Sequence, residues 1–172
     1  MSDSYEAKAA VLAARENCDL PVLVTLIFDE KGKLLTGGTV DSTVAMLEGL
    51  RVDALGVNCG LGPKQMHPII ERLTQVSSLP IIVNPNAGLP RSENGKTVFD
   101  IAPAEFSDLM EEIAGMGVQA LGGCCGTTPE HLRLTIEKCR KVPFRPPVAK
   151  RRTVVSSFSQ AVEIGPKPVI IG

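Results

Sequence analysis

Apolar runs of strand length alternate with segments of helix length along most of this chain. Each of four runs rich in aliphatic and β-branched residues is followed by a segment with the composition or capping residues of a helix. The predicted strands are residues 21–28, 52–58, 80–84 and 118–122. The predicted helices are residues 5–16, 41–50, 63–75, 103–116 and 129–140. This alternation predicts an α/β fold in which helices cover a parallel sheet.

The number of β–α units limits the architecture. Four consecutive parallel units cannot close a (β/α)₈ barrel, which needs eight strands and typically about 250 residues. No G-x-G-x-x-G loop follows a predicted strand, so a dinucleotide-binding sheet has little support. The units form either a small open sheet or half of a barrel. Because a helix comes before the first strand, the order favours half of a barrel.

Composition and charge exclude several classes of protein. Hydrophobic residues make up 44% of the chain and charged residues 22%, which predicts a packed core. The net charge is −1 and no basic stripe occurs before residue 140, so nucleic-acid binding is not expected. The apolar runs are too short to cross a bilayer, and the polar N-terminus does not resemble a signal peptide. We therefore expect a cytoplasmic protein without a membrane partner, whose five cysteines are thiols or metal ligands.

Three cysteines follow predicted strands. Cys59 comes directly after strand 52–58, and the adjacent pair Cys124 and Cys125 follows strand 118–122. The carboxyl ends of parallel strands meet at one edge of a sheet, where α/β proteins place their active sites. Three thiolates with one open position describe a catalytic zinc site, whereas a structural zinc site has a fourth protein ligand. The open position would accept a substrate sulfur and hold it as a thiolate.

Other chemistry at these cysteines stays open. Cys124 and Cys125 are also candidates for a thiol redox pair, and three cysteines do not exclude another thiophilic metal. Cys18 and Cys139 lie in or beside helices without a partner at ligand spacing, so we interpret them as small hydrophobic residues.

The remaining polar candidates are weaker. His67 falls within a predicted helix and reads as a surface or core residue, while His131 lies in the first turn of the last helix and reads as a cap residue. Asn84 and Asn86 end the third strand, where an amide supports a turn or faces the site. We interpret the basic run 150–152 as a group of charged side chains exposed to solvent.

Three motifs carry a resemblance to a known family. Residues 57–63 (VNCGLGP), 85–88 (PNAG) and 122–131 (GGCCGTTPEH) resemble the homocysteine-binding domain of homocysteine S-methyltransferases. The resemblance implies a (β/α)₈ barrel with zinc held by Cys59, Cys124 and Cys125. It also implies that Asn86 occupies the fourth position of the zinc when homocysteine is absent.

The loop 28–38 and the tail 151–172 are most similar to the cobalamin-dependent methionine synthases of this family. That similarity implies methyl transfer from methylcobalamin to homocysteine, with cobalamin and folate bound by other domains. Residues 1–142 would be the C-terminal half of the homocysteine-binding barrel. Residues 143–172 would be a linker and the start of a folate-binding (pterin-binding) domain, with 168–172 as its first strand.

Part of the substrate site is missing under this interpretation. The acidic residues that bind the substrate amino group in the family belong to the absent half of the barrel. A half-barrel exposes sheet edges and apolar surface, which a homodimer of two halves would cover. A non-catalytic zinc-binding half-domain that needs a partner is the alternative to an enzyme module.

Overall fold

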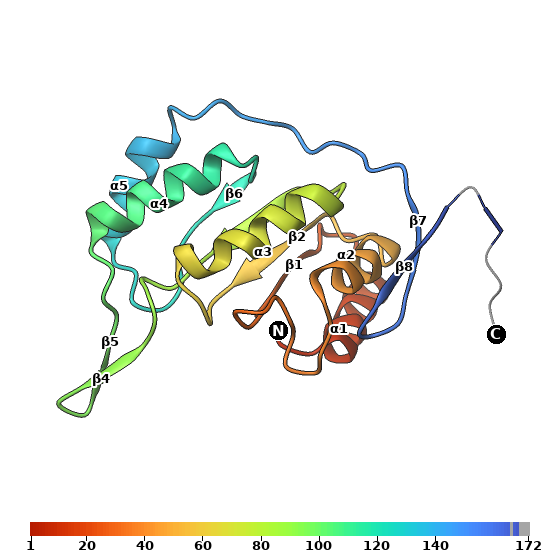
Figure 1. Ribbon diagram of the computed structural model, residues 1–172, viewed down its shortest axis with the longest axis horizontal. Helices are drawn as coiled ribbons and strands as arrows, with labels where there is room; N and C mark the ends of the chain where they lie inside the picture. Colours follow the sequence, from red (N-terminus) through yellow and green to blue (C-terminus); the bar gives the residue numbers. More distant parts are fainter. Residues whose placement is uncertain (166, 169–172) are drawn as a thin grey trace.

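The computed structural model describes residues 1–165 and 167–168, and its centre is a four-stranded parallel sheet (Figure 1). The strands are β1 (Leu23–Leu26), β2 (Ala54–Asn58), β3 (Ile81–Asn84) and β6 (Ala120–Leu121). The helices are α1 (Ser4–Asn17), α2 (Val40–Gly49), α3 (Pro63–Val76), α4 (Pro103–Gly115) and α5 (Pro129–Cys139). The predicted order of strands and helices is confirmed, although β1 and β6 are shorter than the apolar runs that predicted them.

The strands lie in the sheet in the order β1-β2-β3-β6, which is also their order along the chain. A doubly wound sheet reverses its strand order at a switch point, and this sheet does not. Consecutive helices contact one another in the same sequence, from α1 and α2 to α4 and α5. Figure 1 shows α2, α3 and α4 lying side by side over the sheet. This is the β–α arrangement of a barrel wall rather than that of a dinucleotide-binding sheet.

The core lies between this helical layer and one face of the sheet. Alternate strand residues such as Val24, Leu55 and Val83 are buried there, together with Ile70 of α3 and Phe106 of α4. The other alternate strand residues point to the opposite face of the sheet, which none of the described helices covers (Figure 1). On that face Leu23 is 60% exposed, and Thr25 and Ile82 are half-buried. The sheet therefore has one packed face and one open face.

Two hairpins are additions to the predicted elements. Between the predicted strand 80–84 and the predicted helix 103–116, where we expected only a loop over 85–100 because the segment is rich in Gly, Pro and Asn, β4 (Arg91–Glu93) pairs with β5 (Lys96–Val98), so that expectation was wrong. The second hairpin pairs β7 (Thr153–Ser156) with β8 (Ala161–Ile164). The strand predicted at 168–172 lies, apart from Pro168, outside the described residues.

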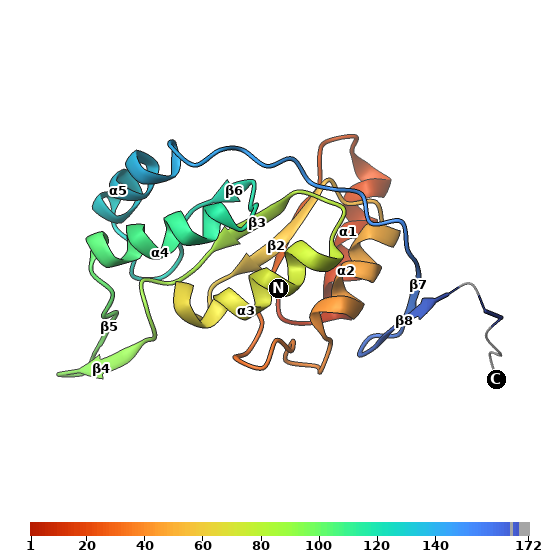
Figure 2. The ribbon, with the colours of Figure 1, turned by 45° about the horizontal axis from the view of Figure 1, so that its top comes forward.

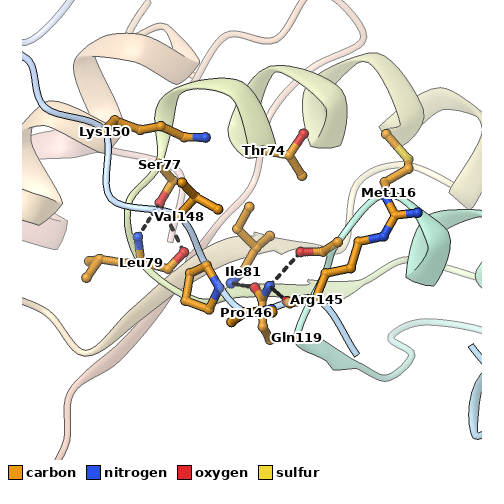
Figure 3. Close-up of a pocket in the computed structure, with 12 residues that line it drawn as sticks. Thr74, Ser77, Leu79, Ile81, Met116, Gln119, Arg145, Pro146, Val148 and Lys150 are labelled. Carbon is orange, nitrogen blue, oxygen red and sulfur yellow. Dashed lines mark hydrogen bonds between the residues drawn. The ribbon is translucent and has the colours of Figure 1, made fainter. Parts of the chain in front are cut away.

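Residues 141–152, here called the strap, cross the amino ends of the strands from α5 toward α2 (Figure 2). The side-chain amide of Gln119, before β6, donates to the backbone oxygen of Arg145 at 2.8 Å. Ser78, before β3, accepts a hydrogen bond from the backbone N–H of Lys150 at 2.9 Å. A small cavity of about 140 Å³ lies between the strap and the sheet (Figure 3). The segment predicted as a linker is thus attached along the sheet.

The hairpin β7–β8 continues the strap onto the helices at the β1 end of the sheet. It contacts α2, and the backbone oxygen of Phe158 lies 3.5 Å from the hydroxyl of Ser42. The rings of Phe158 and Tyr5 of α1 are 5.9 Å apart. Among the described residues, none of the helices has the length and apolar character needed to cross a membrane.

Candidate metal centre

Cys59 leaves the end of β2 in an unusual backbone conformation. Its φ is +57°, in the left-handed region that residues with a side chain rarely adopt, and Gly60 follows at +73°. The backbone N–H of Cys59 donates to the oxygen of Asn84 at 3.0 Å, which ties the end of β2 to the end of β3. This tight turn directs the Cys59 sulfur toward the loop after β6.

Cys124 and Cys125 are held by the loop that follows β3. The N–H of Cys124 donates to the oxygen of Pro85 at 2.8 Å, and the oxygen of Cys125 accepts from the N–H of Ala87 at 2.9 Å. The N–H of Cys125 donates to Oδ1 of Asn86 at 3.1 Å. The loop 85–88 therefore lies between the two cysteine-bearing loops and is hydrogen-bonded to the second.

The three sulfurs form one cluster. The Sγ atoms of Cys59 and Cys125 are 3.6 Å apart, those of Cys124 and Cys125 are 3.9 Å apart, and all three lie within 4.8 Å of one another. Tetrahedral zinc with Zn–S bonds near 2.3 Å separates its sulfurs by about 3.8 Å. A disulfide has sulfurs about 2.05 Å apart, and these cysteines are free thiols. The spacing fits a tetrahedral metal with three thiolate ligands.

Two of these thiols have shifted pKa values. Burial opposes ionisation of Cys59, but hydrogen bonds from the backbone of Gly60, from the other two cysteines and from Asn86 outweigh it, so the pKa of Cys59 is lowered. Burial, followed by the contact with Cys59, raises the pKa of Cys124 to about 11. Without a cation, negative charge at this cluster therefore forms first on Cys59 and is opposed at Cys124.

Asn86 lies deep beside the sulfurs, with only 3% of its surface exposed. Its Oδ1 accepts the Cys125 N–H and keeps a second lone pair, since an amide oxygen has two. Asn84 differs from Asn86, because its backbone oxygen accepts the Cys59 N–H and its side chain lies against Gly122. A Cβ on Gly122 would come within 2.4 Å of the Asn84 Oδ1, so any side chain there would require the Asn84 amide to move.

Gly126 shows why the Gly-Gly-Cys-Cys-Gly run is needed. Its φ is +79°, and a Cβ there would lie 2.4 Å from the ring of Phe99. The aromatic ring therefore packs directly on the backbone of the cysteine loop. Glycine permits this close approach, and nothing in the sequence identified Phe99 as the residue that packs there.

The other histidines and cysteines named as candidates are not part of the sulfur cluster. His67 is exposed, as predicted for a surface residue, and His131 belongs to the capping box of α5, as predicted. Cys139 packs beside the core, but Cys18 is exposed at the end of α1, so its prediction as a buried hydrophobic residue was wrong. The capping position leaves the Cys18 side chain outside the helix layer.

The charged run 150–152 is only partly solvated. Arg152 is half-buried and pairs with Glu163 of β8 at 3.2 Å, and the backbone of Lys150 belongs to the strap contact with Ser78. The prediction of a purely solvated run was therefore wrong for Arg152.

Sequence reasoning missed two features near the site. Asn58 precedes Cys59 on the open face, and its buried Oδ1 has no hydrogen-bond partner within the described part of the chain. Residues 99–101 return from β5 to the site, where the N–H of Ile101 donates to the oxygen of Ala87 at 3.0 Å. The second feature left no signal in the sequence, because the contact is made by backbone atoms.

The fold and the cysteine cluster together define a class: an α/β protein whose parallel strands present, at their carboxyl ends, three cysteines that could hold a metal ion. The family model for homocysteine S-methyltransferase matches residues 1–139. The chain belongs to the homocysteine S-methyltransferase family.

Curated relatives are longer than this chain. It is 32% identical over 180 residues to methionine synthase of Mycobacterium leprae and 31% identical over 175 residues to methionine synthase of Mycobacterium tuberculosis. These alignments cover 98% and 94% of this chain but 15% of each relative.

Solved structures share the fold. The metallated form of the homocysteine methyltransferase MmuM from Escherichia coli superposes with a TM-score of 0.64 at 23% identity, over 82% of this chain and 43% of that one. The apo form gives a TM-score of 0.65 at 22% identity, over 80% of this chain and 47% of that one. Less than half of those chains therefore corresponds to the fold described here.

Proposed function

We propose that this chain binds zinc through Cys59, Cys124 and Cys125 and presents the thiol of homocysteine for methylation in methionine synthesis. The observation that carries the proposal is the sulfur cluster, whose spacings of 3.6 and 3.9 Å bracket the separation expected around tetrahedral zinc. Family membership supports homocysteine as the substrate. This chain spans 15% of the length of the methionine synthase relative, so the complete activity is proposed for a longer protein of that kind.

Zinc at the three sulfurs would lower the pKa of a substrate thiol and hold it as a thiolate near neutral pH. The chain's own residues do the rest of the positioning. The amide oxygen of Asn86 lies beside the sulfurs, where it would be the fourth ligand of the zinc until homocysteine replaces it. The loop 85–88 keeps the two cysteine-bearing loops at a constant separation through its backbone hydrogen bonds.

The proposed reaction is the transfer of a methyl group from cobalt to the homocysteine sulfur, with the two partners held by different domains. Cys59, Cys124 and Cys125 would hold the zinc that presents the homocysteine thiolate as nucleophile, and methylcobalamin would supply the methyl group. Cobalamin and folate would be bound by domains other than the residues described here. The open face of the sheet, with Leu23 60% exposed, is where the other half of a (β/α)₈ barrel would pack.

Metal analysis of the purified chain tests the proposal. We expect about one zinc per chain, lost when Cys59, Cys124 or Cys125 is replaced by alanine. The matched controls are Cys18→Ala and Cys139→Ala, which remove cysteines outside the cluster and should retain the metal. A metal-free chain that forms a Cys124–Cys125 disulfide in air, seen by mass spectrometry, would support a redox pair instead.

Homocysteine titration separates an enzyme module from a zinc-binding half-domain. If the chain binds substrate, homocysteine should release about one proton per zinc as its thiol ionises. Serine, which lacks the thiol, is the control ligand. Zinc binding without any response to homocysteine would show that the chain holds the metal but needs the rest of the barrel for its substrate.

A further inference from the structure

His131 is buried, and both of its ring nitrogens are engaged. Only 5% of its surface is exposed, and its ring meets that of Phe106 edge to face at 5.3 Å. Nδ1 accepts from the backbone N–H of Thr128 at 3.2 Å, within the capping box of α5. Nε2 lies 3.0 Å from the backbone oxygen of Ile101, which can only accept, so Nε2 carries the proton. A helix cap needs only the first of these contacts.

The second contact leads toward the sulfurs. Ile101 accepts from His131 through its oxygen and donates through its N–H to the oxygen of Ala87 at 3.0 Å. Ala87 in turn donates to the oxygen of Cys125 at 2.9 Å. Two residues before Ile101, the Phe99 ring packs on Gly126, the residue after Cys125. Residues 99–101 therefore lie between His131 and the cysteine loop and contact both.

The hydrogen bonds converge on one ligand. Both backbone polar groups of Cys125 are held by the loop 85–88: the oxygen by Ala87 and the N–H by Asn86. Ile101 is hydrogen-bonded to the same loop, through the backbone oxygen of Ala87. Without the His131 contact, the Ile101 oxygen would lose the donor that connects residues 99–101 to α5.

We propose that His131 is a positioning residue for the metal centre, acting through Ile101 and Ala87 to fix Cys125 and Asn86. The proposal rests on the proposed zinc site and concerns a residue that contacts none of the sulfurs. The competing role is a helix cap alone, which predicts an effect on the stability of α5 and none on the metal. Outer hydrogen-bond partners of metal sites typically change affinity by about 10- to 100-fold when they are lost.

A pair of substitutions separates the two roles. His131→Gln keeps an acceptor for Thr128 and a donor for Ile101, because its amide oxygen and nitrogen are joined through one carbon, as the imidazole nitrogens are. His131→Glu keeps the acceptor for the capping box but presents no donor to the Ile101 oxygen. Thr128→Ala is the matched control for the cap, since it removes the hydroxyl 2.8 Å from Nδ1 and leaves the Ile101 side unchanged.

The first readout needs no metal. Amide hydrogen exchange is measured on the metal-free full chain at Ile101, Ala87 and Cys125. His131→Glu should speed exchange at these amides by about tenfold or more, while His131→Gln and Thr128→Ala leave it near the wild-type rate. Unchanged exchange in folded His131→Glu would overturn the proposal, and this result would stand even if the wild-type chain bound no zinc.

The second readout is the metal centre itself. Zinc affinity is measured by competition with a chromophoric chelator, and the thiolate-to-cobalt absorption of the Co²⁺-loaded chain reports the sulfur geometry. We expect His131→Glu to lose about 10- to 100-fold in affinity and to shift the cobalt spectrum, with His131→Gln close to wild type. Wild-type affinity and spectrum in His131→Glu would show that His131 is only a cap. If His131→Glu does not fold, zinc affinity is measured in Thr128→Ala instead. A loss of about 10- to 100-fold in that variant would overturn the proposal, and wild-type affinity would support it.

Discussion

Cys59 has a backbone conformation that favours glycine. A non-glycine residue in the left-handed region costs about 1–2 kcal/mol, and Cys59 has a φ of +57°. The cost is tolerated because the turn places its sulfur 3.6 Å from that of Cys125. At this position the backbone strain accompanies a place in the sulfur cluster.

The effect of replacing Cys59 with glycine on stability should therefore be opposite with and without zinc. We expect Cys59→Gly to stabilise the metal-free chain by about 1 kcal/mol, because glycine adopts positive φ without strain. The same variant should show none of the increase in melting temperature that zinc gives the wild-type chain. Thermal unfolding with and without zinc measures both effects. Cys18→Gly, at an extended position with φ of −156°, is the control and should gain nothing.

The thiol pKa values predict how metal binding depends on pH. Cys124 has a pKa of about 11, so at neutral pH it carries a proton that a metal must displace. Apparent zinc affinity should therefore rise with pH by at least about tenfold per unit between pH 6 and 8. Competition titrations at several pH values measure this slope. An affinity independent of pH would show that the sulfurs are not the ligands.

At the level of elements, local sequence signals were sufficient for the helices and the parallel strands but not for the hairpin β4–β5. Its turn is Asn94–Gly95, with φ values of +51° and +74°, which is the pattern of a two-residue hairpin turn. The Asn-Gly signal was present, but the flanking residues are polar and exposed, so no apolar alternation marked strands around it. A hairpin without a buried face leaves little trace in hydrophobic periodicity.

Asp41 at the start of α2 and Arg72 of α3 join two neighbouring helices. Both carboxylate oxygens accept from the guanidinium, at 2.9 and 2.5 Å. The hydrogen bond from Arg72 lowers the pKa of Asp41 below its ordinary value. Because the folded-state pKa is depressed, the stabilisation is present above the ordinary pKa and is lost as pH falls through the folded value.

Asp41→Asn should destabilise the chain at pH 7 by about 0.5 kcal/mol, since the pair is partly exposed and screened by solvent. The difference from wild type should shrink as pH falls below the ordinary pKa of Asp41, because the wild-type carboxylate becomes neutral as pH approaches its lowered folded-state pKa. Urea unfolding at pH 7 and pH 3 measures the effect. A double-mutant cycle with Arg72→Gln is the control, and additive losses would show that the two residues do not interact.

In the whole molecule, the strap and the hairpin β7–β8 extend the folded body beyond the residues matched by the family model, which ends at residue 139. The sequence indicated a linker there because residues 141–152 are rich in proline and basic residues. Composition could not show that Gln119 and Ser78 bind the backbone of this segment. Those contacts depend on where the amino ends of two distant strands lie.

Truncation after Val142 tests the contribution of this segment. Losing the hydrogen bond that Gln119 donates to the strap, the one that Ser78 accepts from it, and the Tyr5–Phe158 contact should lower the free energy of unfolding by about 1–3 kcal/mol. Truncation after Gly165 keeps these contacts and is the control. Urea unfolding compares the two with the full chain. Equal stability of both truncated chains would show that the strap contributes nothing.

The meeting of the three cysteines could be predicted from the sequence, whereas the contacts that hold them in place could not. The position of three cysteines after two strands was enough to place them at one sheet edge, because parallel strands end together. The contacts that hold them are mostly backbone hydrogen bonds between the loops at 85–88 and 122–128, which no side-chain pattern encodes. Asn86 is an exception, since its amide was visible in the sequence and lies beside Cys125.

The hairpin β4–β5 projects away from the body in Figure 1, and both of its ends join the molecule next to the sulfur cluster. One end is at Gly88, beside Asp100, and the other is at residues 99–101, which contact Ala87 and Gly126. Because Ile101 is hydrogen-bonded to Ala87 and Ala87 to Cys125, a displacement of the hairpin would reach the cysteine loop through these backbone contacts.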